Sequence, residues 1–244
     1  MLYAMIEMQR AAVAPVRMMA RMNKLAFSSD YNVLSRTEFG KSVAASASLL
    51  ESLTRTYGKP VWGLDTTEIG GKEVDVTPET VWSQPWCNLI HFKRDPEQLQ
   101  DALGGSKPQP RLLIVAPLSG HYATLLRGTV EAFLPHFEVY ITDWSDARMV
   151  PLIQGRFDLD DYISYVRNMI GEVGPGANVL AVCQPGPPVL AAVALMAEDN
   201  DPNQPSSMTF MGSPIDCRKS PTVPNLLAEE REFQWSKHNN QDSG

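Results

Sequence analysis

The chain has 244 residues, 43% of them hydrophobic and 20% charged, which is ordinary for a globular protein with one sizeable core or two small ones. Its formal net charge of -7 argues against a nucleic acid as partner, because phosphate backbones select clustered Lys and Arg. The three cysteines, Cys87, Cys183 and Cys217, form no CxxC pair and no Cys/His ligand spacing, so neither a disulfide framework nor a metal site is predicted.

Residues 1 to about 25 are expected to form an amphipathic helix, because apolar residues from Met1 to Val13 recur at helical spacing. Pro15 is expected to kink or break this helix. Two roles are open for it: packing on the domain, for which Met is well suited, or a surface for an apolar polymer or a partner. Charges interrupt the segment, so no signal peptide is predicted, and no run in the chain approaches the roughly 18 apolar residues that a membrane span needs.

Residues 42–57 predict a second helix, and the polar stretch 63–80 predicts loops and short strands. Together they form an N-terminal helical and mixed region, residues 1–104, which is expected to pack on the core. After the Gly/Pro-rich linker 104–110, strands alternate with helices, and this alternation indicates βαβ units and a doubly wound, mostly parallel sheet. The core is therefore placed at residues 105–224, followed by a polar tail, 225–244, that contains no further strand.

Four strands are predicted in this core. The first is almost wholly apolar, which is typical of a strand buried on both faces of a parallel sheet. Between the second and third strands, Asp158 is a good N-cap for a helix that ends at Gly174. The four segments are residues 111–118, 137–144, 178–182 and the beginning of 207–216.

The most informative stretch is 178–196, where a strand runs directly into Cys183 and then into a proline-rich helix start. This strand–turn–helix pattern is the context of a nucleophile elbow in an α/β-hydrolase-type sheet. The helix N-terminus favours a thiolate, and the N–H of Gln184 is expected to point toward a developing oxyanion. The pentapeptide 181–185 lacks both flanking glycines of G-x-S-x-G, so the spacing alone leaves two interpretations of Cys183: a nucleophile, or a small buried hydrophobe at a strand end.

A second motif follows the first strand of the core. Ser119 and Gly120 are expected to allow close backbone approach and to supply the other oxyanion N–H, and His121 is expected to line the pocket. The alternative is an ordinary Gly-containing turn with a surface histidine.

Three aspartates follow later strands. Asp143 and Asp146 are candidates for a catalytic acid, but Asp is common in turns, and we favour a structural role in which Asp146 pairs with Arg148. Asp216 is the runner-up acid.

Many segments of the chain, in order, resemble intracellular polyhydroxyalkanoate depolymerases, from Met1 to about His238. The resemblance implies an α/β-hydrolase fold, a cytoplasmic location on storage granules of poly(3-hydroxybutyrate) and related polyesters, and no metal or organic cofactor. It also implies that Cys183 attacks the ester carbonyl and that water hydrolyses the acyl-enzyme, with a histidine as base and an aspartate that orients it. The matching segments are MLYAMIEMQR, KPVWGL, HFKRD, APLSGHYATLLRGTV, VYITDWSDARMVPL, FDLDDYISYV, AVCQPGPPVLAAVALMA and TFMGSPIDCRKSPT.

The family pattern is not complete in this chain. Nucleophile, acid and histidine follow one another along such hydrolases, but only 61 residues follow Cys183, and their single histidine, His238, lies in the polar tail. We therefore expect a C-terminally truncated enzyme whose acid and histidine fall beyond residue 244, and an isolated chain that is inactive or very weak. An incomplete sheet would leave apolar surface uncovered, so poor solubility or homo-oligomers are expected.

Two other functions stay open. One is a polyhydroxyalkanoate synthase-type acyltransferase, which also uses an elbow cysteine but passes the acyl group to a growing polymer. The other is a noncatalytic granule-binding protein that attaches through its Met-rich N-terminal helix. In each case the expected partner is a polyhydroxyalkanoate granule or oligomer.

Overall fold

The computed structural model describes residues 2–29, 31–54, 58–118 and 122–232. The chain divides into two compact units, residues 1–58 together with 226–244 and residues 59–225. The first contains the N-terminal helices, and the second contains the sheet.

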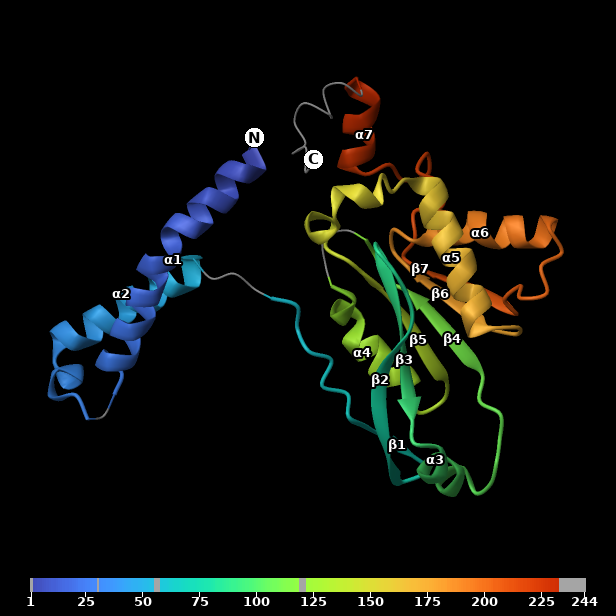
Figure 1. The fold of residues 1–244 in the computed structure, drawn as a ribbon, viewed down its shortest axis with the longest axis horizontal. Coiled ribbons are helices and arrows are strands. Elements are labelled where there is room, and N and C mark those ends of the chain that lie inside the picture. Colours follow the sequence, from blue (N-terminus) through green and yellow to red (C-terminus); the bar gives the residue numbers. More distant parts are fainter. Residues whose placement is uncertain (1, 30, 55–57, 119–121, 233–244) are drawn as a thin grey trace. The chain divides into compact units, whose positions relative to one another are not determined.

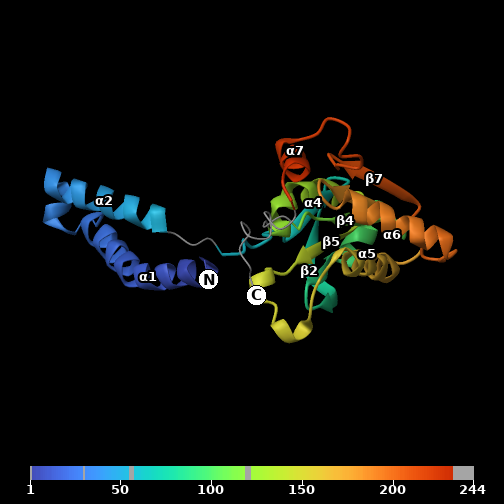
Figure 2. The same ribbon diagram turned by 90° about the horizontal axis from the view of Figure 1, so that it is seen from above.

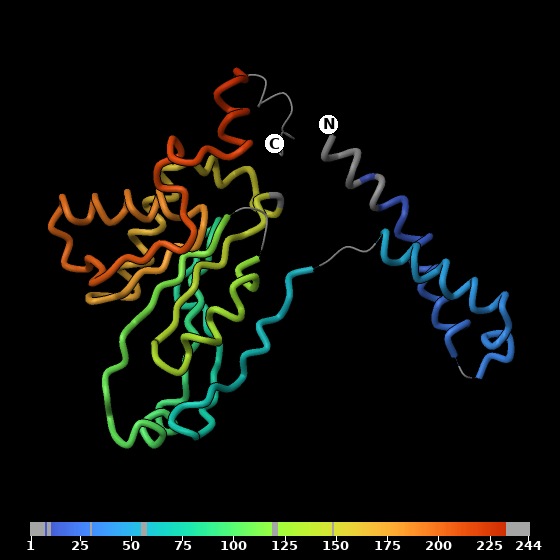
Figure 3. Tube along the Cα trace, turned by 180° about the vertical axis from the view of Figure 1, so that it is seen from behind, coloured from blue at the N-terminus to red at the C-terminus, as the bar shows by residue number. Residues whose placement is uncertain are grey.

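The N-terminal unit is an antiparallel pair of helices, α1 (Leu2–Phe27) and α2 (Glu38–Thr54), joined through the short helix η1 (Val33–Arg36) (Figure 3). Both helices were predicted from the sequence. The expected break at Pro15 does not occur, because α1 continues through it as one helix that packs along α2. Lys24 of α1 and Glu51 of α2 form an ion pair of 2.7 Å across the helix pair.

The second unit is built on a seven-stranded sheet of order β1-β2-β3-β5-β4-β6-β7 (Figure 1). Strands β5, β4, β6 and β7 pair in parallel, and β3 pairs antiparallel with both β2 and β5. Five of the seven strands therefore run in one direction, and β1 and β3 run in the other. The strands are β1 (Thr66–Ile69), β2 (Lys72–Gln84), β3 (Cys87–Arg94), β4 (Arg111–Val115), β5 (Glu138–Trp144), β6 (Asn178–Val182) and β7 (Ser207–Met211).

Helices cover both faces of the sheet. The face that carries α4 is packed by residues such as Val130 and Leu134, and the opposite face by residues of α5 and α6 such as Val166 and Val189. Figure 2 shows α5 and α6 side by side, away from α4. The helices are α3 (Pro96–Leu103), α4 (Arg127–Phe133), α5 (Leu159–Val173), α6 (Gly186–Glu198) and α7 (Val223–Glu230), with short 3-10 helices η2 (Ala123–Leu126), η3 (Ala147–Met149) and η4 (Leu152–Gln154).

The predicted elements of the core are present. The run 111–118 gives β4, and Leu112 to Pro117 are buried, as expected for a strand covered on both faces. Asp158 caps α5: its carboxylate accepts from the N–H groups of Asp160 (3.0 Å) and Asp161 (3.2 Å). Asp161 accepts in return from the N–H of Asp158, which completes a capping box.

The sheet begins earlier in the chain than the expected boundary at residue 104. Strands β1 to β3, residues 66–94, belong to the same sheet as β4 to β7, and β3 pairs with β5 over Cys87–Phe92. The first hairpin turns at Gly70 and Gly71, whose φ angles are +59° and +77°. Glycine adopts this left-handed backbone without the steric cost of a Cβ, so a Gly-Gly pair between two strands is itself a hairpin signal.

An ion-pair cluster joins β3 to the start of β5. The buried guanidinium of Arg94 donates to Glu138 at 2.9 Å and to the carbonyl of Leu134 at 3.0 Å, and His91 contacts the other Glu138 oxygen at 2.8 Å. The hydrogen bond from His91, followed by that from Arg94, outweighs burial and lowers the pKa of Glu138.

We expect Glu138→Gln to destabilise the folded protein by about 2 kcal/mol at neutral pH, because it leaves the charge of Arg94 buried without its anion. The pKa of Glu138 is lower in the folded protein than in the unfolded chain. Its contribution to the free energy of unfolding is therefore fully present above about pH 4.3, and it is lost as pH falls through the folded pKa. Denaturant unfolding of both proteins between pH 7 and pH 3 measures this difference.

The control is Glu131→Gln, which removes an exposed pair with Arg127 and should cost no more than about 0.5 kcal/mol. A difference in unfolding free energy between wild type and Glu138→Gln that stays constant down to pH 3 would contradict this role of the carboxylate.

Candidate active site

Cys183 lies in the turn between β6 and α6 and is exposed. Its φ of +66° is in the left-handed region, which a residue other than glycine adopts only where the surrounding structure imposes it. A nucleophile elbow holds its reactive residue in such a strained strand-to-helix turn. The interpretation of Cys183 as a small buried hydrophobe is wrong, because the residue is exposed.

The backbone around Cys183 is held on both sides. Its N–H donates to the carbonyl of Met211 at 2.8 Å, which extends the β6–β7 pairing by one residue, and its carbonyl accepts from the N–H of Gly186 at 3.2 Å. Pro185 has no N–H. Within the described part of the chain, the N–H of Gln184 has no acceptor, so it is the donor of this turn that is available to a ligand.

Gly186 packs closely against the loop after β7. A Cβ atom at position 186 would lie 2.4 Å from the Cβ of Ser213 and 2.7 Å from its Oγ. The Ser213 hydroxyl also donates to the carbonyl of Ala181 at 3.3 Å. The turn therefore needs a glycine, but one position later than the pattern G-x-S-x-G would place it.

The side chain of Gln184 connects this turn to the segment after β4. Its Oε1 accepts from the N–H of Leu118 at 3.1 Å. Two residues earlier, the peptide of Ala116 is fixed by β5: its N–H donates to Thr142 Oγ1 at 2.9 Å, and its carbonyl accepts from Trp144 Nε1 at 3.0 Å. These bonds bring the elbow and the loop after β4 together at the carboxyl edge of the parallel strands, where α/β sheets bind ligands.

Ser119, Gly120 and His121 continue directly from Leu118 and lie outside the described residues. Their expected oxyanion and pocket-lining roles stay predictions. The sequence indicated the N–H of Gln184, but its side-chain bond to Leu118 was not foreseen.

Asp143, at the end of β5, is buried and forms an ion pair with Lys59. Its other carboxylate oxygen is buried without a hydrogen-bond partner among the described residues. Burial, and then the Asp143 charge, raise the pKa of the Cys87 thiol well above its usual value. Asp143 is thus held by a lysine inside the fold, and Cys87 is a protonated core thiol that does not compete with Cys183.

The other acid candidates lie elsewhere on the same edge. Asp216 forms a two-point pair with Arg218, at 2.8 Å and 3.1 Å, and the side-chain hydrogen bond in this pair is the main cause that lowers the pKa of Asp216. Asp146 is half-buried before η3, and its expected partner, the Arg148 side chain, lies outside the described residues.

The two histidines that the structure describes are far from the elbow in the sheet. His91 bonds to Glu138 at the amino end of β5, and His136 precedes the same strand. Cys183 follows the carboxyl end of β6, and β5 and β6 flank β4 in parallel, so these histidines lie toward the opposite edge. His238 is among the residues that the structure does not describe. The described residues therefore contain a candidate nucleophile and an oxyanion donor without a histidine base beside them.

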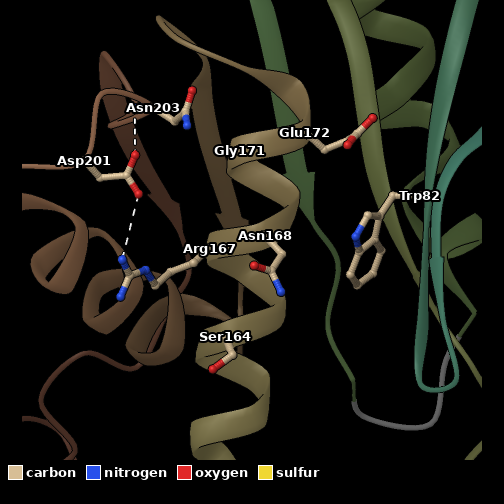
Figure 4. Close-up of a pocket in the computed structure, with 8 residues that line it drawn as sticks. All are labelled: Trp82, Ser164, Arg167, Asn168, Gly171, Glu172, Asp201 and Asn203. Carbon is tan, nitrogen blue, oxygen red and sulfur yellow. Dashed lines mark hydrogen bonds and ion pairs between the residues drawn. The ribbon is translucent and has the colours of Figure 1, made fainter. Parts of the chain in front are cut away.

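An open groove of about 590 Å³ follows the outer side of α5 (Figure 4). Trp82 lines one side, Asn203 lines the other, and Arg167 is paired with Asp199 at 2.7 Å and lies 3.8 Å from Asp201. Cys183 is not among the lining residues, so this groove is separate from the elbow. Across the described ranges, no group of three or more His, Cys, Asp or Glu could hold a metal ion, and no helix is long and apolar enough to cross a membrane.

The sheet order, the single antiparallel strand β3 inside it and the strained turn after β6 define a fold of the α/β-hydrolase type. No protein-family model matches the sequence, and no curated protein matches it. A solved structure with some similarity is the naproxen esterase (carboxylesterase NP) from Bacillus subtilis, with 11% sequence identity and a TM-score of 0.36. The match covers 55% of this chain and 42% of the esterase chain, so the chain spans less than half of that enzyme.

Proposed function

We propose that the chain is a carboxylic ester hydrolase of the cysteine type that acts on intracellular polyhydroxyalkanoate. One observation carries the chemistry: an exposed cysteine at φ +66°, at the carboxyl end of a central parallel strand, directly before a helix. Strain of this kind costs about 1–3 kcal/mol and persists where the surrounding structure imposes it, often at functional sites.

The chemistry follows from the groups in the turn. The Cys183 thiolate adds to the ester carbonyl carbon, and the carbonyl oxygen becomes an oxyanion that the free N–H of Gln184 can bind. The C–O bond to the alcohol then breaks, the leaving alkoxide takes a proton from solvent water, and a thioester remains on Cys183. Water attacks this thioester, the C–S bond breaks, and the carboxylic acid and the thiol are released; the thiol returns its proton to solvent and the thiolate is restored.

The second half of this cycle needs a general base. None of the described histidines lies near the elbow, and Asp143 and Asp216 are held by Lys59 and Arg218. We therefore propose that this chain acylates readily and deacylates slowly, and that its turnover on its own is very low.

The choice of substrate is supported by the ordered motifs that resemble intracellular polyhydroxyalkanoate depolymerases, which include the elbow segment and the segment after β4. A polyester of 3-hydroxybutyrate is uncharged, so it needs no cationic pocket in a chain of net charge -7. The proposal places the protein in the cytoplasm at storage granules, without a cofactor.

The test is incubation of the purified chain with amorphous poly(3-hydroxybutyrate) granules. We expect a small release of 3-hydroxybutyrate that Cys183→Ser reduces to background. Polymer formation from 3-hydroxybutyryl-CoA would instead indicate a synthase, and co-sedimentation with granules without any release would indicate a binding protein.

Gln184→Ala should slow acylation by about tenfold, because it frees the Leu118 N–H and loosens the loop that faces the elbow. Gln184→Glu keeps an acceptor oxygen at the same distance and should recover most of the rate. Stopped-flow release of p-nitrophenol from p-nitrophenyl butyrate measures both. If the Ala and Glu variants are equally slow, the bond to Leu118 is not what positions the loop.

A further inference from the structure

The helix pair α1–α2 carries an apolar surface that stays exposed among the residues that the structure describes. Five long side chains of α1 are 62–71% exposed: Met8, Met18, Met19, Met22 and Leu25. At 100° per residue they fall within one face of α1, and Ala20, which is buried, lies outside that face. We call these five residues the apolar face.

The apolar face continues across the second helix. A groove of about 430 Å³ runs between the helices and is lined by Val16 and Met19 from α1 and by Phe39 and Leu50 from α2. Phe39 is 67% exposed. The exposed apolar side chains of the two helices therefore meet along one side of the pair.

The segment that carries the apolar face is also positively charged, in contrast to the rest of the chain. Residues 1–58 contain seven Lys or Arg and four Asp or Glu, a net charge of +3, while the rest of the chain carries -10. Arg17, Arg21 and Lys24 follow one another at helical spacing on a flank of α1 beside the apolar face. Lys24 forms an ion pair with Glu51 of α2, and Arg21 is exposed.

We propose that the α1–α2 pair binds to a negatively charged lipid surface, with the apolar face inserted at the level of the headgroups and the cations beside it. An amphipathic helix of this length with a basic flank lies in the plane of an interface and does not cross it. Methionine side chains are flexible and adapt to an irregular apolar environment, and α1 contains five of the chain's 11 methionines.

A second copy of the same helix pair is a less suitable partner for the apolar face than an anionic lipid surface. Pairing two apolar faces would bring together two copies of residues 1–58, each with a net charge of +3, whereas anionic headgroups would offset this charge. This inference concerns a surface outside the candidate active site, so it stands independently of the proposed ester hydrolysis.

Co-sedimentation of the full chain with phosphatidylglycerol/phosphatidylcholine vesicles tests the proposal. We expect binding that falls with added salt, that is weak on pure phosphatidylcholine, and that Met18→Glu/Met22→Glu reduces by about tenfold or more. The matched control is Ala45→Glu/Ser52→Glu, which adds the same charge at exposed positions of α2 that do not line the groove. The control should bind nearly as well as wild type, and circular dichroism verifies that both variants keep their helices.

Three results would overturn the proposal. The first is no binding to anionic vesicles. The second is equal loss of binding in the test and control variants. The third is a stable dimer, measured by light scattering, that Met18→Glu/Met22→Glu converts to a monomer while vesicle binding is absent; that result would assign the apolar face to a protein interface.

Discussion

Incubation of the chain with p-nitrophenyl butyrate should attach one butyryl group to Cys183, and Cys183→Ala should lower the acylation rate by about 10³-fold or more. The reason is geometric. The turn after β6 exposes this thiol beside the N–H of Gln184, which has no acceptor among the described residues, whereas Cys87 is buried and Cys217 lies in a loop. Intact-mass measurement after a short incubation counts the acyl groups, and peptide mapping locates them.

The chain offers a matched control for this experiment. Cys217 is also exposed, but it lies in the loop after β7, outside any strand–turn–helix junction, so Cys217→Ala should acylate like wild type. Cys87 is buried with a raised pKa and should stay unmodified in the folded protein. Equal labelling of Cys183 and Cys217 would mean that exposure alone explains the reaction.

The same experiment reports on the general base, which the described residues do not place beside the elbow. If the described residues supply no histidine to the elbow, p-nitrophenol release should show a burst near one equivalent and then a much slower phase. Added imidazole should speed the slow phase by taking over the role of the base. A fast steady state without a burst, abolished by Cys183→Ala, would show that a base is already present.

The sequence predicted the parallel half of the sheet well. Strands such as β4 and β6 are short apolar runs that lie between clear helix signals, and residues 178–182 were bounded as the structure has them. Residues 63–80 were expected to hold loops and short strands, but not a hairpin of β1 and the 13-residue β2 that joins the sheet, because the alternating, largely exposed pattern gives little sign of a long strand. The adjacent glycines at positions 70 and 71 were the local signal that would have revealed it.

For the candidate site, the sequence located Cys183 because strand, cysteine and prolines are neighbours in the chain. It could not give the φ of Cys183, or the bond from Leu118 to Gln184, which joins residues 66 positions apart. The contact of Gly186 with Ser213 and the pair of Lys59 with Asp143 are likewise long-range and have no local pattern.

Gly186→Ala should destabilise the protein by about 2 kcal/mol, although alanine normally stabilises a helix relative to glycine by about 0.5–1 kcal/mol. The added Cβ would lie 2.4 Å from the Cβ of Ser213, a separation that real Cβ atoms essentially never show, so the turn or the loop after β7 must move. Gly128→Ala in α4 is the matched control: apart from its chain neighbours and the adjacent helix backbone, nothing lies within 4 Å of its added Cβ, and it should be neutral or stabilising. Urea unfolding compares the two variants.

The second arm of this test is Ser213→Gly, which removes both atoms nearest to the new methyl group. In that background Gly186→Ala should cost much less, with a coupling energy of about 2 kcal/mol, because the remaining close contact at 3.0 Å is the flexible end of Ile215. Gly186→Ala should also slow the acylation of Cys183, and Ser213→Gly should reduce this loss, since the turn that Ser213 packs against is the one that holds the thiol. If Gly186→Ala is as stable as wild type and acylates at the same rate, the tight packing of the elbow against the loop after β7 does not exist in solution, and the strained turn at Cys183 loses its main support.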